Sequence, residues 1–166
     1  MIAYTDTCFW SHTKEIYDSL SLDIRLLLSE FKWGMTNAVE QEIIYHKLDK
    51  FLPNDQMLKI PITESEIDHF IGKYPSLSEF DLADQTLIVV GKRDEGIILT
   101  DDGDLFVQCQ IFNIKALLLP QFLLFLVQNG NLKKTEVYRC IRFWEQKHRY
   151  KVRDLKKWSK ILSEIK

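Results

Sequence analysis

The chain has 166 residues, the size of one ordinary domain, and 46% of them are hydrophobic, which is enough to bury a core. Glycine and proline are sparse, with 6 and 4 copies, and no low-complexity stretch is present, which argues against extended disorder. Residues 1–130 contain 10 of the 22 basic and 20 of the 24 acidic residues, a net charge of -10, whereas residues 131–166 contain the other 12 basic and 4 acidic residues, a net charge of +8. We therefore predict an acidic domain over residues 1–130 and a basic extension over residues 131–166.

Sequence features that would direct the chain into or across a membrane are missing. The longest apolar run, Ala116–Val127, is interrupted by a proline and a glutamine and is shorter than the ~20 residues that cross a bilayer. The first residues have no basic flank, apolar stretch or cleavage site of a secretory signal. Cys8, Cys109 and Cys140 are odd in number and far apart, which predicts free thiols rather than disulfides or a zinc site. We expect a cytoplasmic protein with no membrane partner.

The first half of the chain is predicted to alternate strands and helices. Hydrophobic spacing predicts a strand, one or two amphipathic helices, a second strand and a further helix, in the ranges 2–5, 11–30, 31–35 and 37–52. Thr36 or Asn37 is expected to cap the last of these helices, and Asn37 with Glu40 resembles a capping box.

The second half continues the alternation and ends in helices. Thr63 and Glu66 predict a capped short helix that ends near Gly72, and Ser78 is expected to begin another helix that stops at Gly91. The remaining predicted elements are two strands, a helix that begins with a proline, and two basic amphipathic helices, in the ranges 97–100, 113–119, 120–129 and 131–166. Such alternation is typical of an α/β fold with a parallel sheet covered on both faces, in which ligands bind beyond the carboxyl ends of the strands.

Acidic residues follow the predicted strands at those ends. Asp6 and the group Asp101–Asp104 each follow an apolar strand, and a third strand leads into the helix that begins near Thr36. Clustered carboxylates repel one another, so a fold tolerates them mainly when a cation compensates their charge. The histidines are scattered along the chain at no ligand spacing, as His12, His46, His69 and His148. Oxygen-only ligands favour Mg²⁺ or Mn²⁺ over zinc, and such an ion supports hydrolysis of phosphodiesters.

Four stretches are similar, in the same order, to the motifs of PIN domains: residues 2–7, 36–43, 84–91 and 97–105. The first stretch resembles the opening strand and first acid, Asp6, and the second resembles a helix that carries the second acid, Glu42. The third resembles the helix that carries Asp84. The fourth is similar to the Thr-x-Asp-x-Asp strand end, with Asp102 and Asp104. The resemblance covers residues 1 to about 130.

The resemblance implies a three-layer α/β/α sandwich with a mainly parallel central sheet, one or two Mg²⁺ or Mn²⁺ ions, and cleavage of single-stranded RNA. The family includes toxin ribonucleases of toxin-antitoxin pairs and RNA-processing enzymes. For this chain it implies a set of catalytic acids, namely Asp6, Glu42, Asp84 and Asp102. It also implies a set of metal ligands, namely Asp6, Asp84, Asp102 and Asp104. A toxin of this family would pair with an antitoxin protein and often form homodimers.

Several of these acids have ordinary structural explanations. Glu40 is the nearby alternative to Glu42, and acids in the first turns of a helix favourably meet the helix dipole without any function. Asp81 is expected to cap a helix while Asp84 binds the ion. Asp101 is expected in a turn, because aspartate and glycine supply turn chemistry.

The basic extension offers candidate RNA contacts: Lys133, Lys134, Arg139, Arg142, Lys147, Arg149, Lys151 and Arg153. Aromatic residues such as Phe143, Trp144 and Trp158 interleave with these cations, and such mixtures can hold phosphates and stack unpaired bases. The competing interpretation is a solvated helix surface with part of the aromatic set in the core.

Three functions are compatible with the sequence. The first is a metal-dependent endoribonuclease. The second is a non-catalytic RNA-binding or scaffold protein on the same fold. The third is a phosphatase or receiver-like domain with Asp6 as phospho-acceptor. The third class usually has a second aspartate two residues on, where this chain has Cys8.

Overall fold

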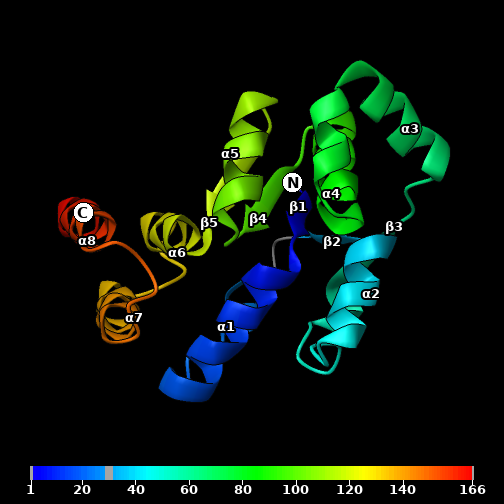
Figure 1. Ribbon diagram of the computed structural model, residues 1–166. Coiled ribbons are helices and arrows are strands. Elements are labelled where there is room, and N and C mark those ends of the chain that lie inside the picture. Colours follow the sequence, from blue (N-terminus) through cyan, green and yellow to red (C-terminus); the bar gives the residue numbers. More distant parts are fainter. Residues whose placement is uncertain (1, 29–31, 166) are drawn as a thin grey trace.

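The computed structural model describes residues 2–28 and 32–165 and contains a five-stranded, all-parallel sheet at its centre. The strands lie in the order β3-β2-β1-β4-β5 (Figure 1). Their bounds are β1 Ile2–Thr5, β2 Lys32–Thr36, β3 Met57–Ile60, β4 Ile97–Thr100 and β5 Lys115–Leu118. The registers are parallel throughout, with Tyr4 opposite Gly34 on one side and Ile98 on the other.

Helices cover both faces of this sheet, so the expected α/β/α sandwich is confirmed (Figure 1). The bounds are α1 Thr7–Leu20, α2 Asn37–Tyr45, α3 Glu64–Lys73, α4 Leu82–Asp94, α5 Gly103–Ile111 and α6 Leu119–Gln128. Right-handed crossovers place α1 and α2 on one face and α3, α4 and α5 on the other. Contacts of α1 with α2, and of α3 with α4, agree with this division. α6 follows the last strand and contacts α1.

The order of the strands reverses between β1 and β4. From β1 the chain moves outward through β2 to β3, crosses back to β4 through α3 and α4, and then moves outward to β5. In open parallel sheets such a reversal leaves a crevice at the carboxyl ends of the two central strands, where ligands bind. Asp6 directly follows β1, and Asp101 and Asp102 directly follow β4, so these acids lie at the edge of the sheet where the strand order reverses.

Some predicted boundaries were wrong for identifiable physical reasons. The helix that begins at Asn37 ends at Tyr45 rather than near residue 52, and Thr36 caps it by accepting a hydrogen bond from the Val39 amide. The helix expected from residue 78 begins at Leu82, because residues 75–79 form a separate 3-10 turn and Asp81 accepts from the Asp84 amide.

Gly91 does not end α4, which continues to Asp94. A Cβ atom at Gly91 would lie 2.8 Å from side-chain carbons of both Ile98 and Ile114. The glycine therefore allows the helix to approach the sheet closely instead of breaking the helix.

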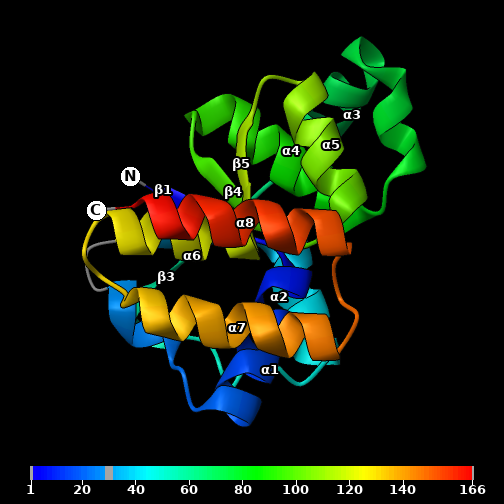
Figure 2. The ribbon, with the colours of Figure 1, turned by 90° about the vertical axis from the view of Figure 1, so that its left-hand side faces the viewer.

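The basic extension forms two helices, α7 Lys134–Gln146 and α8 Val152–Glu164. They pack against each other and against α6, and α7 also contacts α1 (Figure 2). Their inner faces are buried together with the rest of the core, including Trp144 at 1% exposure and Leu162 at 0%. None of the described helices has both the length and the apolar character that crossing a membrane requires.

Candidate functional site

Asp6 is the most buried acid of the candidate site. It follows β1 as the N-cap residue of α1, and only 4% of its surface is exposed. Its amide donates to the Leu99 carbonyl of β4, and the Thr100 hydroxyl donates to its Oδ2 at 2.7 Å. Burial raises the pKa of Asp6 to about 6, against hydrogen bonds from Thr100 and backbone amides that lower it. The carboxylate is therefore held in one place and pays a desolvation cost when it is ionised.

Thr100 links Asp6 to Asp102 at the end of β4. Its Oγ1 accepts from the Asp102 amide at 2.9 Å while its hydroxyl proton is donated to Asp6. Asp102 caps α5, because its Oδ1 accepts from the Asp104 and Leu105 amides at 2.7 and 3.0 Å. One oxygen of Asp102 is thus used by the helix end. The negative charge of Asp102 raises the pKa of Asp6, which places the two carboxylates within electrostatic reach of each other.

Glu42 comes to the same region from α2. The Thr7 hydroxyl, in the first turn of α1, donates to Glu42 Oε2 at 2.7 Å. This bond joins the helix after β1 to the helix after β2. Glu40, the alternative to Glu42, instead pairs with Lys59 of β3 at 2.5 Å. The geometry therefore favours Glu42 over Glu40 as the acid of this site.

Asp84 on α4 completes the group from the other face of the sheet. Burial raises its pKa to about 8, and the negative charges of Asp81, Asp6, Asp102 and Glu42 raise it further in that order. The raised pKa of Asp84 thus reflects its burial first and the neighbouring negative charges second. Asp6, Asp102 and Glu42 therefore all lie within electrostatic range of Asp84.

The other candidate acids have different surroundings. Asp81 is exposed and caps α4, as expected, and Asp104 is exposed in the first turn of α5. Asp101 is not a turn residue facing solvent, because its side chain is fully buried and accepts hydrogen bonds from Tyr150 and His12. Thr7 and Thr100, which position two of the acids, were not singled out from the sequence. The only signal for Thr100 is its place in the Thr-x-Asp-x-Asp pattern.

Among the described residues, no three Asp, Glu, His or Cys side chains are arranged so that they could together hold a metal ion. The donor chemistry nevertheless suits Mg²⁺ or Mn²⁺, since the acids of this region offer carboxylate oxygens and raise the pKa values of Asp6 and Asp84. The Cys8 thiol, whose pKa the same acids raise, also lies near them. Mg²⁺ is commonly held by one or two carboxylates together with water and substrate phosphate, so a closed protein cage is not a requirement. Asp6, Asp84 and Asp102 are the residues that would hold it, with Asp104 at the rim.

The candidate RNA-binding residues of the extension differ in whether they contact the rest of the protein. Lys133, Arg142, Lys147, Lys151 and Arg153 are exposed. Three others make internal contacts: Lys134 donates to the Ile165 carbonyl, Arg139 pairs with Glu136 and donates to the Leu20 carbonyl, and Arg149 pairs with Glu15. The aromatic residues Phe143, Trp144 and Trp158 are buried and cannot stack on bases from these positions. Arg139 is exposed in spite of its pairing, Arg153 pairs with Asp154, and the Lys147 ammonium lies over the Phe143 ring. Lys133, Arg142 and Lys151 are the members of this set that are exposed and have no pairing partner among the described residues.

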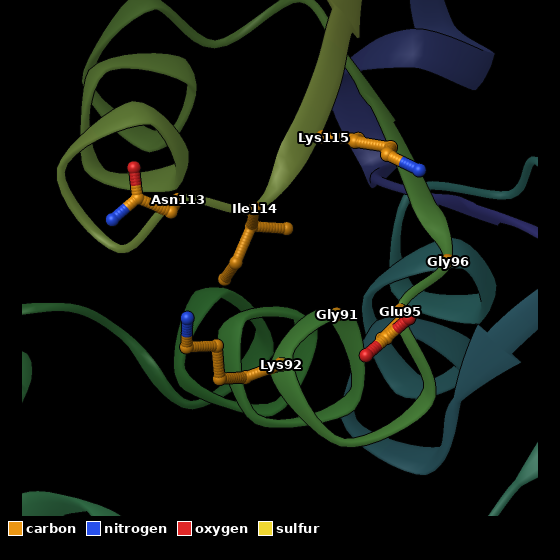
Figure 3. Close-up of a pocket in the computed structure, with 7 residues that line it drawn as sticks. All are labelled: Gly91, Lys92, Glu95, Gly96, Asn113, Ile114 and Lys115. Atoms are coloured by element: carbon orange, nitrogen blue, oxygen red, sulfur yellow. The ribbon is translucent and has the colours of Figure 1, made fainter.

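Two hollows lie near or opposite the acids. A cleft of about 440 Å³ is lined by α2, α3 and α4, and its wall includes Glu42, Asp81 and Thr86. Figure 3 shows a smaller hollow of about 210 Å³, lined by Gly91, Lys92, Glu95, Gly96, Asn113, Ile114 and Lys115. Those residues flank the points where β4 and β5 begin, so this second hollow is at the opposite edge of the sheet from the acids.

No protein-family model matches this chain, and no curated protein matches its sequence.

Thr100→Val is expected to destabilise the protein by about 1–2 kcal/mol, because it leaves the buried Asp6 oxygen and the Asp102 amide without their shared partner. Thr13→Val is the matched control. Thr13 is equally buried, and its hydroxyl has no hydrogen-bond partner among the described residues, so this change is expected to be neutral or slightly stabilising. Urea unfolding of both variants measures the contrast, and equal effects would show that Thr100 does not link the two acids.

Proposed function

We propose that this protein is a metal-dependent endoribonuclease that hydrolyses phosphodiester bonds of single-stranded RNA. The observation that supports the proposal best is the convergence of Asp6, Glu42, Asp84 and Asp102 from four different elements at the crevice between β1 and β4. A fold that only needed stability would not gather acids that raise one another's pKa, so such gathering is an indication of function. The resemblance of the same four positions to PIN-domain motifs agrees with this interpretation.

The roles of the residues follow from their surroundings. Asp6 is buried and held by Thr100, so it provides a fixed negative ligand for a divalent ion, and Asp84 and the Asp102 oxygen that does not cap α5 would complete the set. When bound, Mg²⁺ or Mn²⁺ would orient the phosphodiester, activate water and offset charge on the leaving oxygen. Glu42, held by Thr7, is placed to orient a water molecule at the edge of the group. The exposed cations of α7 and α8 would hold phosphates that flank the cleaved bond.

Cleavage of a mixed-sequence single-stranded RNA by the purified full chain tests the proposal. We expect cutting with Mn²⁺ or Mg²⁺ and none with EDTA. RNA that stays intact under every condition while it binds the protein would instead favour the non-catalytic RNA-binding function. The proposal extends to a role as the toxin of a toxin-antitoxin pair. That role would be supported by metal-dependent growth arrest on expression and its relief by a small co-expressed protein encoded next to this chain.

A further inference from the structure

A half-buried polar cluster, with the fully buried Asp101 side chain at its centre, joins the turn between α7 and α8 to the end of β4. Its members are His12, Glu15, Asp101, Arg149 and Tyr150. They come from three distant parts of the chain: α1, the residue after β4, and the turn of the C-terminal hairpin. Asp101 is the neighbour of Asp102, so the cluster touches the backbone of the acidic site directly.

Asp101 is the centre of the cluster. Its side chain has 0% exposure, and burial of a carboxylate is costly unless donors satisfy it. Tyr150 donates its hydroxyl to Asp101 Oδ2, and His12 Nδ1 lies 2.5 Å from the same oxygen. Both donors meet Oδ2, and Oδ1 is buried without a hydrogen-bond partner among the described residues. The two bonds to Oδ2 hold the carboxylate and thereby constrain the backbone between Thr100 and Asp102.

The partners of the two ring nitrogens indicate the tautomer of His12. The Arg149 guanidinium has donors and no acceptor, so where Arg149 Nη1 meets His12 Nε2, the histidine nitrogen must accept. His12 Nδ1 then carries the proton and donates it to Asp101. Arg149 is held in turn by Glu15 through its other terminal nitrogen. Arg149 in the hairpin turn thus donates to His12, and His12 donates to Asp101, the neighbour of Asp102.

The hairpin turn itself is rigidly supported. The Arg149 amide donates to the Trp144 carbonyl at 3.0 Å, and the Tyr150 ring packs edge-on between Trp144 and Trp158 at 5.2 and 5.0 Å. Both tryptophans are buried in α7 and α8, which lie across α6 (Figure 2). The turn can therefore act as a fixed anchor for Asp101.

We infer that Tyr150 and Arg149 are positioning residues, which hold Asp101 and thereby set the place of Asp102 at the acidic site. The expected effect on ion binding rests on the proposed function, because a displaced Asp102 would matter only to a bound ion or substrate. The structural part of the inference stands on the hydrogen bonds alone. Asp102 is fixed on its other side by Thr100 and by the first turn of α5, so loss of the anchor loosens that turn.

Tyr150→Phe removes the donated hydroxyl and keeps the ring between the two tryptophans, so the variant is expected to fold. The matched control is Tyr138→Phe, the same change on α7 in the same hairpin. Two quantities are measured: amide hydrogen exchange of Asp102 and Leu105 by NMR, and Mn²⁺ affinity by calorimetry. We expect Tyr150→Phe to accelerate exchange at both amides about fivefold or more and to weaken Mn²⁺ binding about tenfold. Tyr138→Phe is expected to change neither.

The two readouts separate the inference from the proposed function. Unchanged exchange at Asp102 and Leu105 in Tyr150→Phe would overturn the positioning role, whatever the ion binding does. Accelerated exchange with unchanged Mn²⁺ affinity would overturn the link from the hairpin to the site. If the unmodified protein neither binds Mn²⁺ nor cuts RNA, the proposed function fails, and exchange at the two amides still decides whether Tyr150 positions Asp102.

Discussion

Asp6→Asn is expected to reduce metal-dependent RNA cleavage by about 1,000-fold, which corresponds to roughly 4 kcal/mol of lost transition-state stabilisation. The change keeps the size of the side chain and the hydrogen bond from Thr100, and removes the negative charge that an ion requires. Because burial raises the pKa of Asp6 to about 6, the neutral amide also spares the fold the cost of a buried charge. Activity should therefore fall while stability at pH 8 stays equal or rises. Initial cleavage rates and thermal unfolding measure the two effects.

Asp68→Asn is the matched control for this prediction. Asp68 is an exposed acid of α3, so its substitution makes the same chemical change outside the acidic group. It is expected to keep full activity. Cleavage by Asp6→Asn at more than a tenth of the original rate would contradict the role of Asp6 as an ion ligand. If Asp6→Asn lost both its activity and its folded structure, the loss of activity would be due to unfolding, and the expectation that stability stays equal or rises would be wrong.

The features of the site that the sequence predicted are those that depend on neighbouring residues. An apolar run followed by an acid places Asp6 and Asp102 at strand ends, and parallel strands bring those ends to one edge of the sheet. Thr63 and Glu66 form the predicted capping box. Asp84 was located through its motif on a helix. These signals involve residues close together in the sequence, so they can be recognised without knowledge of the rest of the fold.

Other elements lack such local signals. β3 is an edge strand with Leu58 and Lys59 exposed, so its residues show no clean alternation. α5 begins with Gly103 and Asp104, residue types that are typical of turns, and the cap that Asp102 provides is visible only in the structure. The direction in which each side chain points at these positions depends on tertiary contacts that hydrophobic spacing does not encode.

The anchor between the hairpin and the site is the clearest case of a feature hidden from the sequence. Asp101 and Tyr150 are 49 residues apart, and Arg149 and His12 are 137 apart. The charge pattern suggested that the extension provides surface cations, whereas Arg149 points inward and Tyr150 is packed between tryptophans. Basic composition alone does not distinguish a cation that meets solvent from one that completes a buried network.

Metal-free protein is expected to lose stability as the pH rises from 4 to 8, and Asp84→Asn is expected to remove much of that loss. The pKa of Asp84 is raised from 3.8 to about 8 on folding, first by burial and then by the neighbouring acids. The unfolded chain therefore releases its proton near pH 4, while the folded protein retains it until about pH 8. Stability associated with this group is fully present below pH 4 and is lost across that interval.

The raised pKa of Asp84 could lower the free energy of unfolding at pH 8 by at most about 5 kcal/mol. Water reaches the partly exposed carboxylate, so we expect a loss of about 3 kcal/mol. At pH 8 in EDTA, Asp84→Asn should exceed the unmodified protein by that amount in free energy of unfolding, and by pH 4 the difference should largely vanish. Urea titrations at several pH values measure it, with Asp68→Asn as the exposed control. A difference that stays constant with pH would mean that Asp84 ionises normally, and the acids would then not form the crowded group on which the ion site depends.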